Sequence, residues 1–298
     1  MYFKDAIEAL GHTPLVELAV LSPNPKVHIL AKLEGQNLGG SSSTKDRIAK
    51  SMIEQAEKDG SLTRDMTIIE ATSGNTGIAL AWLGHKKGYK VTIVMPDCMS
   101  FERQQLIRLF GAELILTEGS KGVQESINTA LKMASDDDKY FLPDQFSNPA
   151  NPLAHYQTTS VEILEDLPYD RLDYLVAGIG TGGTIMGVAR RLREIYPAVK
   201  TIGVEPPPGD AIQGLRCLEN YLPPIINLSL ISERVNVTSK QAIAATNQLL
   251  DKEAVFAGMS SGAVIHQAVK IAEEIDEGVI VAILADGGWK YLSLDMWC

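Results

Sequence analysis

Segments with strand character alternate with helix-like segments along most of this 298-residue chain. Short apolar runs such as 66–71 and 172–179 are each followed by a longer helical stretch, at 75–87 and 184–196. This alternation predicts an α/β fold of parallel, doubly wound sheets with short connections. The two prolines within 148–152 predict a linker between two such series. We therefore expect two α/β lobes, with ligands bound in a cleft at the C-terminal ends of strands.

The bounds of the individual elements follow from the periodicity of the apolar residues. We predict helices over 46–58, 75–87, 100–110, 123–134, 184–196, 240–252 and 261–275. We predict strands over 27–33, 66–71, 90–95, 113–117, 140–142, 172–179, 201–205, 255–257 and 279–285. Ser100 is the expected N-cap of its helix. The proline-rich stretch 206–224 is the longest irregular segment, and loops of this length are usually functional or mobile.

Net charge and apolar runs restrict the class of partner. A net charge of −10 at pH 7 disfavours nucleic acid, because phosphate binding needs a basic face. The N-terminus shows no secretory signal, and the longest apolar run, 279–285, is too short to cross a bilayer. We expect a cytoplasmic protein with neither a nucleic-acid nor a membrane partner.

Cysteine and histidine usage argues against a disulfide framework and against a metal site. Three widely separated cysteines form no C-x-x-C pair, which predicts reduced thiols: Cys98, Cys217 and Cys298. The five histidines show neither an i,i+4 pair nor a metal-ligand grouping. We therefore predict no metal site.

A Gly/Ser-rich loop, 39–44, leads into Lys45 and a helical stretch. A lysine held at a loop-to-helix junction can form a Schiff base, provided that desolvation or a positive neighbour lowers its pKa. The alternative is a solvated lysine beside Asp46 and Arg47.

Two glycine loops directly follow strands, Thr-Ser-Gly-Asn-Thr-Gly at 72–77 and Gly-Thr-Gly-Gly-Thr at 180–184. Each leads into a helix, so backbone N–H groups and hydroxyls point at a bound anion. Neither loop has dinucleotide or P-loop spacing. Together with the lysine they predict a ligand that carries a phosphate and a second anion. Pyridoxal phosphate with an amino-acid substrate meets this description, and so does a sugar phosphate or a nucleotide.

Six motifs occur in the order seen in the cysteine synthase family of fold-type-II pyridoxal phosphate enzymes, and the chain resembles that family over nearly its whole length. The motifs are Thr13-Pro14-Leu15, Lys32-Leu33-Glu34-Gly35, Lys45-Asp46-Arg47, 72–77, 180–184 and Gly258-Met259-Ser260-Ser261-Gly262. The segment 285–293 looks closer to the cysteine synthase B branch, especially its O-phosphoserine sulfhydrylase members.

The resemblance implies a two-domain fold, similar to the β subunit of tryptophan synthase, in which each domain is a mostly parallel sheet flanked by helices. Residues 1–40 plus 146–298 are expected to form the larger domain, which holds the phosphate of pyridoxal 5'-phosphate. Residues 41–145 are expected to form a smaller, mobile domain that binds substrate. The family also suggests a homodimer.

Residue roles are carried over from the family motif by motif. Lys45 is expected to form the Schiff base and then act as acid and base at the substrate Cα. Asn75 is expected to hydrogen-bond the cofactor's ring oxygen, and Ser260 to face the pyridine nitrogen. A hydroxyl there favours β-elimination over transamination, because it does not enforce ring protonation. As an alternative, Ser260 caps the helix 261–275.

The remaining expected site residues bind anions. The cofactor phosphate is expected to lie on Gly180, Thr181, Gly182, Gly183 and Thr184. The substrate carboxylate is expected to bind at Thr72, Ser73, Gly74, Thr76 and Gln145. Arg216 resembles an arginine of phosphoserine-using members and is expected to pair with the phosphate of O-phosphoserine. The alternative for Arg216 is a surface salt bridge.

The implied reaction is β-replacement, which forms L-cysteine from O-phosphoserine or O-acetylserine and a sulfur donor. The donor is sulfide, thiosulfate or a thiocarboxylate on a sulfur-carrier protein. Three alternatives are kept: cystathionine or lanthionine synthesis, desulfhydration, and a catalytically silent relative that binds a serine acetyltransferase.

The lysine loop departs from the family pattern. Leu38 stands where the family usually has proline, and two extra residues lie between Gly40 and Lys45. The extra residues either shift the lysine loop or bulge outward, and the motif Asp46-Arg47 directly after Lys45 favours the outward bulge.

Overall fold

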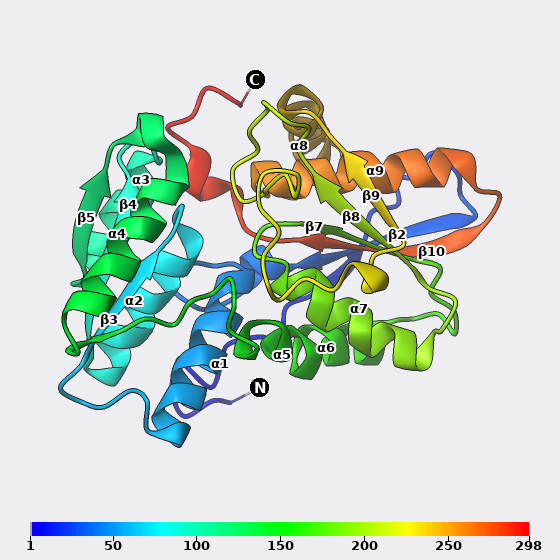
Figure 1. The fold of residues 1–298 in the computed structure, drawn as a ribbon. Helices are drawn as coiled ribbons and strands as arrows, with labels where there is room; N and C mark the ends of the chain where they lie inside the picture. The colour runs from blue at the N-terminus through cyan, green and yellow to red at the C-terminus, as the bar shows by residue number, and fades with distance from the viewer. Residues whose placement is uncertain (1, 298) are drawn as a thin grey trace.

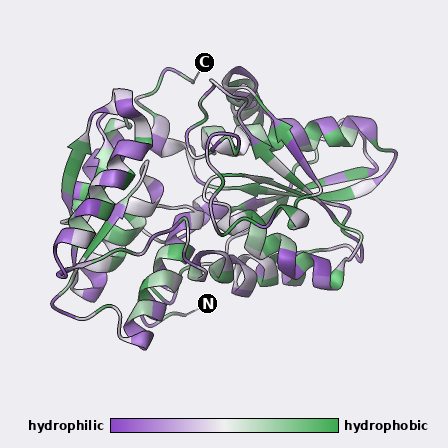
Figure 2. Ribbon diagram, viewed as in Figure 1, coloured by the Kyte–Doolittle hydropathy of each residue, from purple (hydrophilic) through white to green (hydrophobic). Residues whose placement is uncertain are grey.

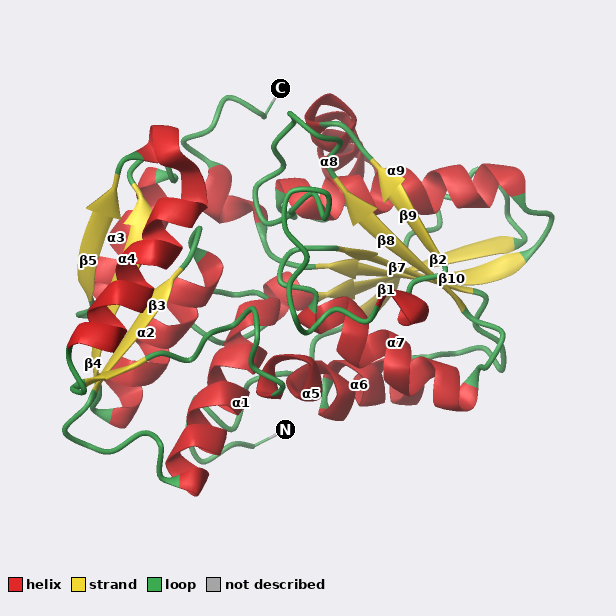
Figure 3. Ribbon diagram, in the orientation of Figure 1, coloured by secondary structure: helices red, strands yellow, loops and turns green. Residues whose placement is uncertain are grey.

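The computed structural model describes residues 2–297, which fold into two sheets flanked by helices (Figures 1 and 3). The larger sheet has six strands in the order β1-β2-β10-β7-β8-β9. These are β1 Leu15–Glu17, β2 Val27–Leu33, β10 Gly278–Leu284, β7 Tyr174–Gly178, β8 Lys200–Glu205 and β9 Glu233–Asn236. Neighbouring strands run parallel except β1 and β2, which pair antiparallel.

Helices cover both faces of the larger sheet, which explains the continuous apolar run of β10. Val279, Val281 and Ile283 point to the face covered by α6 and α7, whereas Ile280 and Ala282 point to the face covered by α8 and α9. The apolar colour of Figure 2 follows these central strands. The helices are α5 Ala150–Gln157, α6 Thr159–Asp166, α7 Gly183–Ile195, α8 Ser239–Glu253 and α9 Met259–Glu274.

The smaller sheet has four parallel strands in the order β5-β4-β3-β6. These are β5 Glu113–Thr117, β4 Lys90–Pro96, β3 Thr67–Ala71 and β6 Tyr140–Phe141. Ile68 packs toward α1 and α2, and its neighbour Ile69 packs toward α4, as expected for alternating side chains on a strand. The helices are α1 Thr44–Asp59, α2 Asn75–Lys87, α3 Phe101–Leu109 and α4 Gly122–Asp136.

The prediction of an α/β fold with mostly parallel sheets is confirmed, but the stretch 148–152 is not an extended linker. Helix α5 begins at Ala150, with Pro149 just before it and Pro152 in its first turn. Proline is tolerated there because the first backbone N–H groups of a helix have no intrahelical acceptor. Proline content therefore marked the start of a helix.

Three short elements also differ from the prediction. The stretch 255–257 forms no strand in the described part of the chain, where Ala257 makes only an isolated bridge to Gly287. Strands β1 and β9 were not predicted, because three or four residues are too few to establish an alternating pattern.

Cys98 and Cys217 are free thiols as expected, and Cys298 lies outside the described residues. No helix within 2–297 has both the length and the apolar composition needed to cross a membrane.

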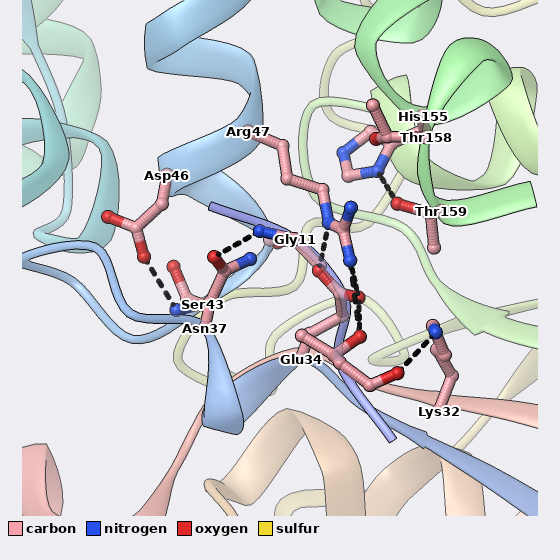
Figure 4. A network of polar contacts seen from close by, with 12 residues as sticks. Gly11, Lys32, Glu34, Asn37, Ser43, Asp46, Arg47, His155, Thr158 and Thr159 are labelled. Atoms are coloured by element: carbon pink, nitrogen blue, oxygen red, sulfur yellow. Dashed lines mark hydrogen bonds and ion pairs between the residues drawn. The ribbon is translucent and has the colours of Figure 1, made fainter. Parts of the chain in front are cut away.

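A buried ion network joins α1 to β2 and α6 (Figure 4). Arg47 Nε donates to Glu34 Oε2 at 2.7 Å, and Arg47 Nη1 donates to Glu162 Oε1 at 2.6 Å. Lys32 Nζ lies 2.8 Å from Glu162 Oε2. Because two cations face two carboxylates, each buried charge has a partner. The network holds the residue two positions after Lys45 against the larger sheet.

This network predicts a loss of stability in acid. Burial raises the pKa of Glu162, but the hydrogen bonds and charges of Arg47 and Lys32 outweigh burial and lower it to about 2 from 4.5. A carboxylate whose pKa is lower in the folded state than in the unfolded state stabilises the fold, and this contribution is complete at any pH above the unfolded-state pKa. That stabilisation is lost as the pH falls from about 4.5 toward 2. Urea unfolding of the native protein and of Glu162→Gln at falling pH measures it. The variant is expected to be less stable at neutral pH and to lose less stability in acid.

Candidate active site

A cavity of about 750 Å³ lies at the residues that directly follow β3 and β7. Its walls also include the first residues of α1, α2 and α9 and part of the loop 206–224. Of the predicted site residues, all but Gly183 line this cavity: Lys45, Thr72, Ser73, Gly74, Asn75, Thr76, Gln145, Gly180, Thr181, Gly182, Thr184, Arg216 and Ser260. The structure thus brings together residues that lie up to 215 positions apart in the chain, between Lys45 and Ser260.

Lys45 is the second residue of α1 and lines the cavity. Ser43 caps the helix by accepting from the Lys45 backbone N–H at 3.0 Å, and Lys45 Nζ donates to Thr44 Oγ1 at 2.9 Å. Burial is the main cause that lowers the pKa of Lys45, and the ammonium of Lys290 lowers it further, while Asp286 and two other carboxylates oppose the shift. The lowered pKa favours the neutral, nucleophilic amine. Lys45 lines the cavity and its amine bonds to Thr44 rather than to Asp46, which argues against the solvated-lysine interpretation.

The loop before Lys45 turns inward, so the expected outward bulge is wrong. Ser41 and Ser43 are 1% exposed or less. Their backbone N–H groups each donate to the Asp46 carboxylate at 3.0 Å. Figure 4 shows the contact between Ser43 and Asp46. Ser42, between them, has a φ of 44°. Buried N–H groups need acceptors, and Asp46 satisfies both of these only if the loop folds inward.

The glycine loop 180–184 leads into the N-terminus of α7. Thr181 Oγ1 accepts from Asn151 Nδ2 at 3.1 Å, and Thr184 Oγ1 lies 3.1 Å from His155 Nε2. Gly183 does not line the cavity, and it packs so closely against Asn151 that a Cβ there would collide with it. The first N–H groups of α7 have no side-chain cap, so the loop offers donors to an anion.

Ser260 is the second residue of α9 and is 4% exposed. The N-cap of α9 is Gly258, so the alternative reading of Ser260 as the cap is wrong. Ser260 lines the cavity, and its hydroxyl lies next to Gly214.

The loop after β3 is held by its own hydrogen bonds. Thr76 Oγ1 donates to Gln145 Oε1 at 2.6 Å, and Gln145 Nε2 donates to the carbonyl of Ala71 at 3.1 Å. Thr72 Oγ1 accepts from the N–H of Gly74 at 3.0 Å. These bonds position the start of α2, whose N-cap Gly74 makes no side-chain cap bond. The loop therefore presents a helix N-terminus to the cavity.

Asn75 begins α2, and its two amide ends have different surroundings. Its Nδ2 donates to Asp286 Oδ2 at 2.8 Å. Its Oδ1 is buried and has no hydrogen-bond partner within residues 2–297. A buried amide with unused hydrogen-bonding capacity on a cavity wall is suited to a polar ligand.

A family model for pyridoxal-phosphate dependent enzymes matches residues 7–286. The chain is 42% identical over 287 residues to cysteine synthase B of Escherichia coli (strain K12). The matched region covers 96% of this chain and 93% of that protein. The chain belongs to the cysteine synthase family of pyridoxal-phosphate dependent enzymes.

Solved structures of related enzymes have the same fold. An O-ureido-L-serine synthase mutant with O-ureido-L-serine bound superposes with a TM-score of 0.94 at 37% identity, covering 99% of this chain and 94% of that one. An O-acetylserine dependent cystathionine β-synthase from Helicobacter pylori superposes with a TM-score of 0.92 at 34% identity, covering all of both chains. The predicted two-sheet fold type II and its pyridoxal phosphate cofactor are thereby confirmed.

The cavity of this cysteine synthase family member fits pyridoxal phosphate. A donor-rich glycine loop suits a phosphate, and the unpartnered Asn75 Oδ1 shows a wall built for a polar group. A Cβ on Gly180 would approach the carbonyl oxygen of Gly214 to 2.6 Å, so only glycine keeps this part of the cavity open.

Arg216 lies against two aromatic rings on the cavity wall. Its Cζ lies 4.7 Å from the ring centre of Phe146 and 5.0 Å from that of Tyr221. Within residues 2–297 its guanidinium has neither a carboxylate within 4.0 Å nor a hydrogen-bond acceptor, so the surface salt bridge is wrong. Burial lowers the pKa of Arg216. The two rings meet edge to face with their centres 6.1 Å apart, so they do not enclose the guanidinium from opposite faces, and its N–H groups stay without an acceptor within residues 2–297.

Several residues of the site were not found from the sequence. Arg103 lines the cavity and donates through Nη1 to Ser100 Oγ at 3.0 Å, and that hydroxyl donates to the carbonyl of Lys290. Ser100 is the N-cap residue of α3, as predicted, but its hydroxyl makes these two contacts instead of a cap hydrogen bond. His155 lies behind Thr184 and is neutral, because burial lowers its pKa well below 6.5. An isolated histidine or arginine carries no pattern from which this could be deduced.

Proposed function

We propose that this protein forms L-cysteine by β-replacement on an activated serine, with O-phosphoserine as an accepted substrate. The observation that carries the proposal is the location of the half-buried Lys45 in one cavity with two helix N-termini that follow glycine loops. A nucleophilic amine and two anion sites match a phosphate-bearing aldehyde cofactor together with a substrate carboxylate.

Each residue has a role that its surroundings support. Bound pyridoxal phosphate acts as an electron sink for the bond broken at the substrate Cα. In this proposal Lys45, favoured as a neutral amine by burial, takes the Cα proton and returns it. Thr181, Thr184 and the N–H groups of 180–184 hold the cofactor phosphate, and Ser260 faces the pyridine nitrogen.

The substrate carboxylate is proposed to bind at Thr72, Ser73, Gly74, Thr76 and Gln145. The N-terminus of α2 supplies N–H donors and the positive end of the helix dipole there. The half-buried Ser73 makes no side-chain hydrogen bond within residues 2–297, which leaves its hydroxyl available. We further propose that residues 41–145 close over the substrate against 1–40 and 146–298.

Arg216 supports O-phosphoserine, because a guanidinium with free in-plane donors pairs with phosphate through two parallel hydrogen bonds. Arg216→Ala is expected to lower the ratio of kcat/KM for O-phosphoserine to that for O-acetylserine by about 10- to 100-fold, the worth of a charged hydrogen bond. Arg216→Lys is expected to restore only part of the ratio, since an ammonium lacks the planar fork.

Arg190→Ala is the matched control. Arg190 is also stacked on an aromatic ring, with its Cζ 4.9 Å from the centre of Tyr156, but it lies outside the cavity. In Arg190→Ala the ratio of kcat/KM for O-phosphoserine to that for O-acetylserine is expected to match that of the native protein. An unchanged ratio in Arg216→Ala would eliminate the role proposed for this arginine.

A second candidate reaction is supported by the relative that is an O-acetylserine dependent cystathionine β-synthase. Arg216 could equally bind the carboxylate of an amino-acid thiol in cystathionine or lanthionine synthesis. Product analysis separates the two reactions: O-phosphoserine with sulfide is expected to yield cysteine faster than serine with homocysteine yields cystathionine. The reverse order would favour the second candidate.

Sulfur donor, assembly and location are proposed on the family alone. We place the protein in the cytoplasm as a homodimer that takes sulfide, thiosulfate or a carrier-bound thiocarboxylate. Assays with each donor and sedimentation analysis of the purified protein test these points.

A further inference from the structure

The segment after β10 connects the elements that carry Lys45 and Asn75. It contains Asp286 and the 3-10 helix η4, Gly288–Tyr291. Lys290 is completely buried, and its Nζ donates to the carbonyl oxygens of Ser41 and Ser42, the latter at 3.3 Å. Both carbonyls belong to the inward-turned loop that precedes Lys45.

Asp286 makes the second connection. Its Oδ2 accepts from Asn75 Nδ2 at 2.8 Å and from the Tyr291 hydroxyl at 2.8 Å, and it lies 3.6 Å from Lys290 Nζ. A carboxylate only accepts hydrogen bonds, so it fixes which end of the Asn75 amide faces it. The nitrogen of Asn75 is therefore held on the Asp286 side.

Both kinds of backbone polar group in the loop 41–43 are hydrogen-bonded by buried charged side chains. Lys290 binds its carbonyls, and Asp46 accepts from the N–H groups of Ser41 and Ser43. Water cannot replace these partners, because the side chains of Asp46, Asp286 and Lys290 are at most 1% exposed. Removing one of these charges leaves the others without compensation in a site of low dielectric.

We propose that Lys290 and Asp286 are positioning residues of the active site, Lys290 for the loop that bears Lys45 and Asp286 for the amide of Asn75. The proposal rests on the function proposed above, since both residues act through groups that face the cofactor. It also accounts for the two-residue-longer loop, whose carbonyls are the partners of Lys290.

The two residues have opposite electrostatic effects on Lys45. The positive charge of Lys290 lowers the pKa of Lys45, and the negative charges of Asp286, Glu34 and Asp46 raise it. Lys290 itself faces Asp286, Asp46 and Arg103. A purely structural contribution by the pair would not produce shifts of opposite sign when each is neutralised.

The test uses the holoenzyme and follows the visible absorbance of its bound cofactor against pH. The pH at the midpoint of this absorbance change is expected to rise by about one unit in Lys290→Met and to fall by about one unit in Asp286→Asn. Lys290→Arg keeps the charge and is expected to keep the midpoint. Thermal unfolding of each variant is measured in parallel.

Lys32→Met is the matched control. Lys32 is equally buried and pairs with Glu162, but it does not line the cavity. This variant is expected to lose stability with no change in the midpoint. The proposal is overturned if neither midpoint moves, or if both move in the same direction.

Asp286→Asn is isosteric and decides the question by itself if Lys290→Met does not fold. The outcome is distinguishable from a failure of the proposed function. A native holoenzyme with a pH-dependent absorbance but no cysteine formation refutes the function and leaves the positioning test intact.

Discussion

Lys45→Ala is expected to abolish cysteine formation, with a loss of at least about 10³-fold, because it removes both the group proposed to link the cofactor and the proposed acid–base at the substrate Cα. Borohydride reduction followed by digestion and mass spectrometry provides the direct readout. The native protein is expected to carry the reduced cofactor on the peptide that contains Lys45, and the variant to carry none. The variant should remain folded, since the Lys45 side chain makes a single hydrogen bond, to Thr44.

Lys50→Ala is the control for this experiment. Lys50 lies on the same helix, half-buried, and donates to the carbonyl of Ile7 at 3.2 Å outside the cavity. It is expected to keep activity and labelling. Labelling of another lysine in the native protein, or a variant that retains turnover, would contradict the assignment. An unlabelled native protein would instead support the catalytically silent relative.

Arg47→Met is expected to destabilise the fold by about 3–5 kcal/mol, because it leaves buried carboxylates without their cation. Arg47 makes hydrogen bonds of 2.6–2.8 Å to Glu34 and Glu162, and Glu34 is completely buried. Equilibrium unfolding in urea measures the loss as a lower midpoint at unchanged slope.

Arg171→Met is the surface counterpart. Arg171 pairs with Asp173 and Glu277 at 2.8 Å and 3.0 Å, but its side chain is 49% exposed. Exposed pairs contribute about 0–1 kcal/mol, so this variant is expected to unfold close to the native midpoint. Equal losses in the two variants would show that burial of the Arg47 network adds nothing to stability.

Most of the fold could be predicted because its signals are local. The run 279–285 is apolar at every position, and a strand buried on both faces requires that pattern. The loops 72–77 and 180–184 each follow a strand directly, so their position at the cavity followed from topology. Prediction failed at Pro149 and Pro152, where the same residues serve a linker or a helix start and local sequence does not choose between them.

The contacts that orient the site could not be predicted. Ser41 and Lys290 are separated by 249 positions, and Asn75 and Asp286 by 211. No periodicity spans such distances. The aromatic rings against Arg216 belong to Phe146 and Tyr221, which lie 75 positions apart in the chain, and no motif joins them.

The sequence by itself determined the α/β class, the family and the amine, glycine loops and arginine that enclose the cavity, because each of these depends on neighbours within a few residues. Only the tertiary structure decided three points: the longer loop turns inward, Arg216 meets no carboxylate within residues 2–297, and Asp286 and Lys290 contact Asn75 and the loop that precedes Lys45. The physical reason is burial. A charge or an N–H group removed from water must find its partner wherever the folded chain places one, and that partner is most often remote in sequence.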